Sequence, residues 1–447
     1  MKVELAGYNI DEVMINDDGT PETIAAAYAR VSRDPRDIFE LRMEAIEKIE
    51  KARKSCETIV YDYGHSAIAE TAVFNIDIMD VSRLVVETIQ HSRLCSFIEK
   101  SYRYQKVDGQ YIIPEELDKS FLRSSFISCI KEQVEVYHKI YDAILENLKE
   151  KNSGIKKAIL KNIAKEDARY VTPLALTTQM GMTINARNLP KMIKRLRECG
   201  LREGIILGDM LYERTASIVP SLIKYCDTQQ GHHLLNRNFK GNFGITVEEG
   251  TSHIDRNVQL QYYTPSSDER LAAVIAYDKC VTFQKVNGIT SKELIDSELE
   301  KLGEYDPVPR SFEAIDFAFT ISCSASAFAQ IKRHRMAMLI KKPYYRFCFI
   351  VPQTVIDAGM KNLFIETCEE SCLLSRSIEE KHGILLSEYI LPQSAKRSIL
   401  LKMNARELYH FAKLRCREDA QWEIREIANK MVEQVKQVAP FAFAGLK

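Results

Sequence analysis

The stretch VQLQYYTPSSDERLAAVIAYDKC, residues 258–280, repeats an order of elements that already occurs at the start of the chain. Residues 3–8, VELAGY, alternate like a β-strand, and residues 21–33, PETIAAAYARVSR, have the spacing of a helix. A strand followed by a helix therefore occurs twice. Repeats of this length are typical of a duplicated domain, because the units of a solenoid span only about 20 to 50 residues.

A second pair of similar segments supports the duplication. Residues 182–197, MTINARNLPKMIKRLR, resemble residues 401–415, LKMNARELYHFAKLR. The separation between matching positions shrinks along the chain, so the insertions must lie mainly in the first copy. We expect most of them in the charged helical stretch from about 115 to 165.

These matches divide the chain into a first repeat, residues 1–226, a linker, residues 227–256, and a second repeat, residues 257–447. The linker is rich in Gly, Asn and His. Its adjacent pair His232 and His233 is more typical of solvated side chains than of a metal site, because no third ligand is near. Each repeat reads as strand, helix, a central strand (residues 73–78 and 317–321), then long helices. This order predicts an α+β fold, with a small sheet and long helices in each copy.

The composition argues against several classes of function. Lys plus Arg and Asp plus Glu both number 62, so no overall basic charge favours nucleic acid. No apolar run reaches the roughly 20 residues that span a bilayer, and the N-terminus lacks the pattern of a signal peptide. The 11 Cys form no CxxC pair, and Cys368 and Cys372 are expected to be reduced thiols. We therefore predict a cytoplasmic protein that binds no nucleic acid, membrane or metal.

The sharpest candidate site is FAQIKRHRMAM, residues 328–338. In a helix Gln330, Arg333 and His334 would share one face, because they lie at positions i, i+3 and i+4. Arg333 and Arg335 beside His334 form a compact cationic patch, and guanidinium groups bind phosphate through paired hydrogen bonds. A basic helix end, favoured by the C-terminal dipole, would explain the same residues without a function.

Two segments of the first repeat are further candidates. In SFIEKSYRYQ, residues 96–105, an extended backbone would project Ser101 and Arg103 to one side and offer a phosphate a hydroxyl and a guanidinium. In YDYGHSAIAE, residues 61–70, His65 follows a glycine at the start of a helix and can approach a cofactor. The alternatives are an ordinary polar loop for the first segment and a capping or packing histidine for the second.

The last candidate is NARELYHFAKLRCREDAQWEIR, residues 404–425. On a helix Asn404 and Arg415 lie about three turns apart and point the same way, while His410 lies on another face. Asn404 followed by Glu407 three residues later also resembles a capping box, so Asn404 is either a ligand or an N-cap.

Taken together, these segments resemble the flavin-dependent thymidylate synthases. The second repeat is similar to that family in its R-H-R motif and in its N-x-R, H-F-x-x-L-R and A-Q-W-E-I-R strings. The first repeat is similar in G-H-S-A-I-A-E, in E-K-S-Y-R-Y and in D-A-R-Y-V-T-P. The resemblance covers most of both repeats, and it implies two tandem copies of that family's fold.

Each repeat also departs from the family pattern, and the departures are complementary. In the first repeat Gln90, His91 and Ser92 stand at the R-H-R motif, and Leu196 stands where the second has Arg415. The second repeat has Lys341, Pro343 and Tyr345 at the E-S-x-R-Y positions, and Glu388 where the first has Arg169. This pattern suggests a site shared between the repeats.

The resemblance implies the following site, whose catalytic residues are Arg415, His334 and His65. The flavin, FAD, would contact Ser32, His65 and Glu70 of the first repeat, and Arg333, His334, Arg335, Asn404 and His410 of the second. The nucleotide would contact Glu99, Ser101, Arg103 and Arg169 of the first repeat, and Gln330 and Arg415 of the second.

The family's reaction converts dUMP to dTMP by methylation, with reduced FAD as hydride donor. Methylenetetrahydrofolate and NADPH are the implied co-substrates. Because the family works as a homotetramer, two tandem chains are expected to form a homodimer. Two alternatives stay open: a related flavoenzyme for another pyrimidine nucleotide, since Ile98 and Asp419 also depart from the family, or a non-catalytic nucleotide-binding protein.

Overall fold

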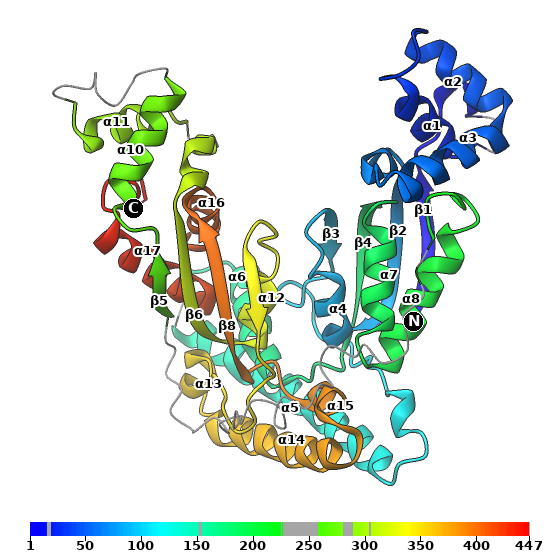
Figure 1. The fold of residues 1–447 in the computed structure, drawn as a ribbon. Helices are drawn as coiled ribbons and strands as arrows, with labels where there is room; N and C mark the ends of the chain where they lie inside the picture. Colours follow the sequence, from blue (N-terminus) through cyan, green and yellow to red (C-terminus); the bar gives the residue numbers. More distant parts are fainter. Residues whose placement is uncertain are drawn as a thin grey trace, which may run out of the picture. The chain divides into compact units, whose positions relative to one another are not determined.

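A computed structural model describes residues 1–15, 19–151, 154–224, 226, 258–279, 289–303 and 305–446 (Figure 1). The predicted linker and its His232–His233 pair lie outside these described residues. The chain divides into two compact units. Unit 1 consists of residues 1–135, 172–247 and 373–390, and unit 2 consists of residues 136–171, 248–372 and 391–447.

Unit 1 is built on a four-stranded antiparallel sheet in the order β1-β2-β4-β3. Helices α7 and α8 pack on each other, α8 also contacts β1, and α1, α2 and α3 form a separate cluster (Figure 1). The elements are β1 (Lys2–Tyr8), η1 (Glu12–Met14), α1 (Glu22–Arg30), α2 (Ile38–Glu47), α3 (Ile49–Glu57), η2 (Thr58–Asp62), η3 (Ser66–Thr71), β2 (Val73–Ser82), α4 (Arg83–Ile89), β3 (Cys95–Glu99), η4 (Glu115–Leu117), β4 (Thr177–Asn185), α7 (Leu189–Arg197) and α8 (Arg202–Thr215).

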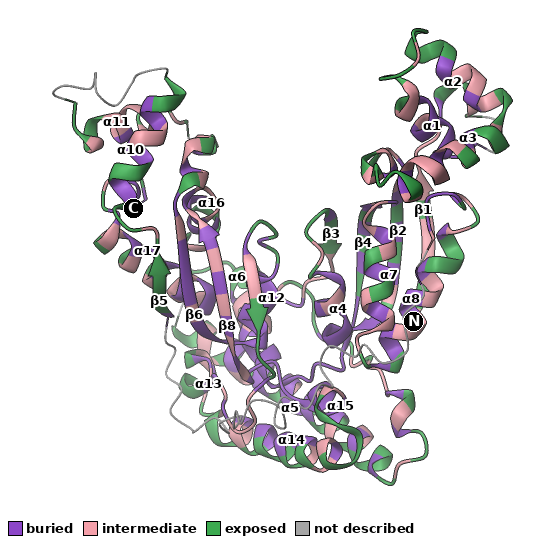
Figure 2. Cartoon of the chain, in the orientation of Figure 1, coloured by how far each residue is buried: buried purple, intermediate pink, exposed green. Residues whose placement is uncertain are grey.

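Unit 2 contains a second four-stranded antiparallel sheet, in the order β5-β6-β8-β7. Of its central strands β6 is mostly buried and β8 alternates buried and half-buried residues (Figure 2). Helix α17 packs against β5 and β6 around the apolar core. The elements are α6 (Lys157–Ala168), η5 (Arg169–Val171), β5 (Val258–Tyr263), α10 (Ser267–Asp278), α11 (Ser291–Leu299), η7 (Arg310–Ala314), β6 (Asp316–Ser324), α12 (Ala325–Ile331), β7 (Met338–Lys341), α13 (Gln353–Asp357), β8 (Lys396–Asn404), α16 (Ala405–Arg415) and α17 (Trp422–Val438).

The two sheets have equivalent strand orders and the same antiparallel pairing. Both also carry an irregularity in the first strand, between Leu5 and Gly7 in β1 and between Leu260 and Tyr262 in β5. The predicted α+β duplication is therefore confirmed. The predicted strands at residues 3–8, 73–78 and 317–321 are confirmed as parts of β1, β2 and β6.

Each unit also takes a segment from the opposite repeat, which the sequence pattern does not reveal. Helix α5 (Leu122–Lys151) begins in unit 1, and its residues from 136 onward belong to unit 2. Helix α14 (Lys361–His382) begins in unit 2; its residues from 373 onward, with α15 (Ile384–Ser387) and η8 (Glu388–Ile390), belong to unit 1. Each compact unit is thus made of both repeats.

A buried Tyr–Glu hydrogen bond fixes the exchanged segment in each unit. In unit 2 the hydroxyl of Tyr170 donates to Glu423 (2.6 Å), which also accepts from the backbone N–H of Ser324 (2.9 Å). In unit 1 Tyr389 donates to Glu203 (2.6 Å), which accepts from the N–H of Ser82 (2.7 Å). Both serines cap the helix that directly follows a central strand. In both units, therefore, a Tyr–Glu hydrogen bond connects a tyrosine of one repeat to a glutamate that is bonded to the sheet of the other.

Candidate functional site

His334 and Arg415 form the centre of the candidate site in unit 2. The Nε–H of Arg415, the last residue of α16, donates to Nε2 of His334 (3.1 Å). One of its terminal nitrogens donates to the carbonyl of Gln330 (3.3 Å). His334 is buried at 6 % exposure, and its ring lies edge-on to Phe411 with the ring centroids 4.7 Å apart. The guanidinium is therefore held from two sides.

The prediction that Gln330, Arg333 and His334 share a helix face is wrong. Helix α12 ends at Ile331, and residues 334–337 form a turn closed by a bond from the N–H of Ala337 to the carbonyl of His334 (3.2 Å). The turn brings His334 inward to Arg415 and leaves Arg333 and Arg335 exposed. The chain thus leaves the helix before His334, and the imidazole ring of His334 is buried, although the spacing of residues 330–334 predicts a continuous helix.

The environment of His334 favours the neutral imidazole. Burial lowers the pKa of His334, and the nearby Arg415 and His410 lower it further, whereas Glu407 raises it. Its Nδ1 lies 3.4 Å from Oε1 of Glu407. Asn404 is the N-cap of α16 and accepts from the N–H of Glu407 (2.9 Å), so the N-cap alternative for Asn404 is confirmed. His410 is exposed, with its ring centroid 5.8 Å from that of His334.

A chain of buried amides links Gln330 to the segment that carries Arg169. The side chain of Gln330 donates to that of Gln421 (3.4 Å), and Gln421 donates to the hydroxyl of Tyr170 (2.7 Å). Arg169, the neighbour of Tyr170, is buried and donates from Nε to the carbonyl of Glu166 (3.1 Å). Unit 2 thus combines Arg169 of the first repeat with Gln330, His334 and Arg415 of the second.

Asp167, two residues before Arg169, is a buried carboxylate with neutral partners. It accepts from Nε1 of Trp422 (2.9 Å) and from the hydroxyl of Thr354 (2.7 Å). Burial raises its pKa from 3.8 to about 6. The folded protein therefore binds this proton more tightly than the unfolded chain does. The contribution of Asp167 to stability is therefore fully present below about pH 4, is lost as the pH rises to about 6 and stays lost above that.

We expect Asp167→Asn to remove this loss of stability, since its amide can accept from Trp422 and donate to Thr354. Above pH 6.5 the variant should be more stable than the wild type by about 2 kcal/mol, and below pH 4 the two should be equal. Thermal unfolding from pH 4 to pH 8 measures the difference, and Asp278→Asn, on the exposed end of α10, is the control. If the stability of wild type and of Asp167→Asn changed equally with pH, the raised pKa of Asp167 would be contradicted.

Three of the four nucleotide-side residues predicted in the first repeat, Glu99, Ser101 and Arg103, lie at the end of β3 in unit 1. The Glu99 side chain is buried and accepts from Gln90 (2.9 Å) and Arg83 (3.5 Å). The predicted extended backbone at Ser101 and Arg103 is wrong, because a turn follows β3: the N–H of Tyr104 donates to the carbonyl of Ser101 (3.1 Å). A second bond, from the N–H of Arg103 to the Ser101 hydroxyl (3.3 Å), tightens this turn.

Two of the predicted flavin residues line one hollow of about 660 Å³ in unit 1. Ser32 follows α1, and His65 is the N-cap of η3, directly after Gly64 with φ +75°. The other lining residues include Arg33, Lys54, Tyr28 and Tyr63. Among the described residues neither Arg33 nor Lys54 forms an ion pair. Glu70 is exposed and pairs with Arg187.

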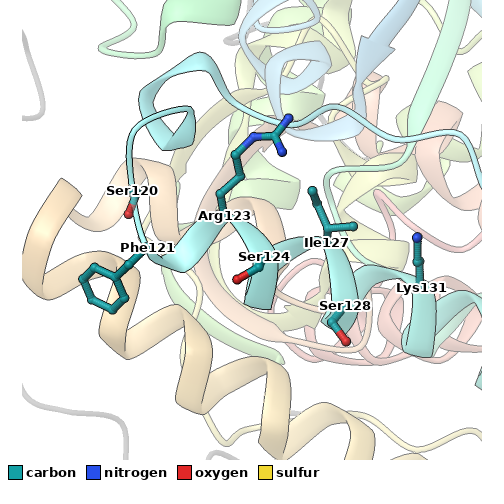
Figure 3. Close-up of a pocket in the computed structure, with 7 residues that line it drawn as sticks. All are labelled: Ser120, Phe121, Arg123, Ser124, Ile127, Ser128 and Lys131. Atoms are coloured by element: carbon teal, nitrogen blue, oxygen red, sulfur yellow. The ribbon is translucent and has the colours of Figure 1, made fainter.

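A second hollow of unit 1, of about 570 Å³, contains none of the predicted residues. It lies along the start of α5, with Arg123 and Lys131 projecting from that helix (Figure 3). Lys381 of α14 lies 4.0 Å from the ring centroid of Phe121 at its edge. All its lining side chains are exposed or half-buried, so we assign it no function.

Sequence reasoning missed several residues of the unit 2 site, above all Gln421, Glu423 and Tyr170. They occur within motifs that the resemblance had marked, A-Q-W-E-I-R and D-A-R-Y-V-T-P, but their hydrogen bonds depend on the segment exchange. Within the described part of the chain no group of three His, Cys, Asp or Glu side chains could hold a metal ion. No described helix is both long and apolar enough to cross a membrane.

Comparison with known proteins identifies relatives of both repeats. The model of the family described as thymidylate synthase complementing protein matches residues 13–221 and 259–441. A UPF0159 protein of Thermoplasma acidophilum is 26% identical, over 95% of this chain and 93% of its own length. A flavin-dependent thymidylate synthase of Clostridium tetani is 33% identical over 46% of this chain and 82% of its own. A UPF0159 protein of Chlamydia muridarum is 23% identical over 88% of this chain and 80% of its own.

Proposed function

Since the chain belongs to the thymidylate synthase complementing protein family, we propose that it is a flavin-dependent thymidylate synthase that methylates dUMP to dTMP. The observation that carries this proposal is the pair formed by Arg415 and Gln330. The amide oxygen of Gln330 is buried, and no described group donates a hydrogen bond to it. The guanidinium of Arg415 contacts the backbone of the same residue.

This pair suits the edge of a uracil ring, which presents an N–H flanked by two carbonyl oxygens. The Gln330 oxygen would accept from the ring N–H, and Arg415 would donate to a carbonyl oxygen. A cation at that oxygen stabilises negative charge that develops on the ring during the reaction. Because His334 is held neutral, it adds no second positive charge beside Arg415.

The phosphate of the nucleotide would be bound by arginines of the first repeat. Arg169 would supply a guanidinium group in unit 2, and the resemblance to the family implies Arg103 and Ser101 of unit 1 as further phosphate-binding residues. The buried Glu99 would hold the start of the Ser101–Arg103 turn, through its bonds to Gln90 and Arg83. The proposed site thus uses residues of both repeats, as the complementary losses predict.

The residues of unit 1 fit a flavin dinucleotide. The hollow around Ser32 and His65 has cations for a diphosphate in Arg33 and Lys54, and aromatic rings in Tyr28 and Tyr63. Glu70, Arg333, Arg335, Asn404 and His410 are the further residues that would hold FAD. Bound FAD would supply the hydride. The chain's own residues bind and orient the reactants and exclude water. Methylenetetrahydrofolate as methylene donor, NADPH as reductant and a homodimer complete the proposal.

Anaerobic reoxidation of the flavin tests this function. The protein is loaded with FAD, reduced with dithionite and mixed with dUMP, with methylenetetrahydrofolate, or with both. We expect rapid reoxidation and dTMP formation only with both. Gln330→Ala should weaken dUMP binding about tenfold, the value of one or two hydrogen bonds. Gln259→Ala, on the exposed strand β5, is the matched control. Failure to bind FAD, or reoxidation with another nucleotide only, would overturn the proposal.

A further inference from the structure

The Glu407 carboxylate does not make the backbone contact that its position, three residues after the N-cap Asn404, predicts. In a capping box the residue three places after the N-cap returns its side chain to the N-cap backbone. Glu293 does this at the start of α11, where Thr290 and Glu293 exchange both bonds. At α16 only half of the box forms: Asn404 accepts from the N–H of Glu407, while the Glu407 carboxylate faces His334.

This orientation places three side chains in series. Oε1 of Glu407 lies 3.4 Å from Nδ1 of His334, and Nε2 of the same ring accepts from Nε of Arg415 at 3.1 Å. The side chains of Glu407 and His334 are only 10% and 3% exposed. Water therefore has little access to either side chain. The neighbouring protein groups, rather than solvent, determine which ring nitrogen carries the proton.

The hydrogen bond that Arg415 donates to Nε2 of His334 determines that a neutral ring carries its proton on Nδ1. Arg415 has no acceptor atom, so its contact requires an unprotonated Nε2. A neutral ring must then carry its proton on Nδ1, which is buried, has no described hydrogen-bond partner and lies 3.4 Å from Oε1 of Glu407. Burial and the cation Arg415 lower the pKa of His334, and His410, the remaining titratable neighbour, does the same. The Glu407 carboxylate, 3.4 Å from Nδ1, is the described group whose negative charge favours a proton on that nitrogen.

The first repeat provides an internal comparison. The positions of Glu407 and Arg415 are occupied there by Asn188 and Leu196, and the histidine remains as His91. His91 is exposed, whereas His334 is buried. The histidine is thus buried in the repeat that has the carboxylate and the guanidinium, and exposed in the repeat that lacks both.

We propose that Glu407 is a positioning residue, which fixes the tautomer of His334 and thereby the direction of the Arg415 guanidinium. Its consequence for catalysis rests on the proposed function, in which Arg415 polarises the pyrimidine. The tautomer itself does not depend on that function. Without Glu407 the Nδ1–H loses the negative charge beside it, the ring is free to rotate, and Arg415 loses its bond to Nε2.

The first test measures the tautomer directly in the intact protein. In protein labelled with ¹⁵N-histidine, the nitrogen shifts of His334, assigned with a His334→Gln variant, distinguish Nδ1–H from Nε2–H. We expect a neutral Nδ1–H ring at pH 7.5 without any ligand. A ring that is charged, or protonated on Nε2, would overturn the proposal even if the protein proves to be a thymidylate synthase.

The second test compares three variants. Glu407→Ala should lower the turnover rate of flavin reoxidation about 10- to 100-fold, the usual effect of misplacing a catalytic group, with little change in FAD affinity. Glu407→Gln, which still offers an acceptor, should retain the Nδ1–H tautomer and most of the rate. Glu293→Ala removes the same residue type from the same helical position and should keep full activity. A merely structural role for Glu407 predicts equal losses for Glu407→Ala and Glu407→Gln, or an unchanged His334 tautomer in both.

Discussion

Expressed alone, residues 257–447 are expected not to fold into a stable monomer, although they contain the whole second repeat. Unit 2 includes residues 136–171 of the first repeat. This segment contributes four large side chains of α5 that are at most 3% exposed, namely Tyr137, Ile140, Tyr141 and Ile144. Each such side chain contributes about 1.5–3 kcal/mol by burial. Together they match the roughly 5–15 kcal/mol that stabilises a whole domain.

Removing residues 136–171 also removes polar contacts, which lowers the stability of unit 2 further. Without this segment Glu423 loses the Tyr170 donor, and Trp422 loses its acceptor Asp167. A buried polar group without a partner costs about 1–3 kcal/mol. We expect co-expression with residues 1–226 to restore a soluble complex of both pieces. A folded 257–447 monomer with cooperative thermal unfolding would contradict the exchange.

A point variant separates the hydrogen bond from the rest of the segment. Tyr170→Phe in the full chain removes the donor to Glu423 and the acceptor of Gln421, and should cost about 2–3 kcal/mol of unfolding free energy. Tyr277→Phe is the matched control, because Tyr277 is 86% exposed. Urea unfolding followed by circular dichroism measures both.

The sequence predicts the duplicated elements well but not the exchange between the repeats. Strands β1, β2 and β6 and the first helix follow from spacing, because alternation and helical periodicity are local properties. Periodicity also predicts helices between about 115 and 165, where α5 and α6 lie. It cannot say which sheet an apolar helix face covers, since that choice depends on contacts far along the chain. The Tyr170–Glu423 hydrogen bond therefore cannot be predicted from the sequence pattern.

The candidate site is predictable in its residue types and less so in its geometry. The resemblance marks Gln330, His334 and Arg415, which the structure brings into contact. The helical spacing fails at Arg333, because the chain turns after Ile331 to bury His334. The capping pattern at Asn404 and Glu407 predicts the N-cap correctly, but it also predicts a backbone partner for the Glu407 carboxylate, which faces His334 instead.

The largest loss of activity is expected from Arg415→Ala, about 10²- to 10³-fold in the turnover rate, as for removal of one preorganised donor at a developing negative charge. Arg415→Lys should recover little of it. Lysine keeps the charge, but it lacks the planar fork that bonds to His334 and to the Gln330 carbonyl at once. Flavin reoxidation with dUMP and methylenetetrahydrofolate measures the rate, and calorimetry measures dUMP binding.

The pattern of these losses distinguishes catalysis from simple binding. If Arg415 acts on charge that develops during the reaction, the rate should fall much further than the affinity for dUMP, since the ground-state nucleotide gains less from the same contact. Arg417→Ala is the control, because Arg417 lies two residues further on and pairs with Asp419 in solvent. Its rate should stay within about twofold of wild type, as expected for an exposed ion pair. An equal fall in rate and affinity in Arg415→Ala would instead make Arg415 a binding residue only.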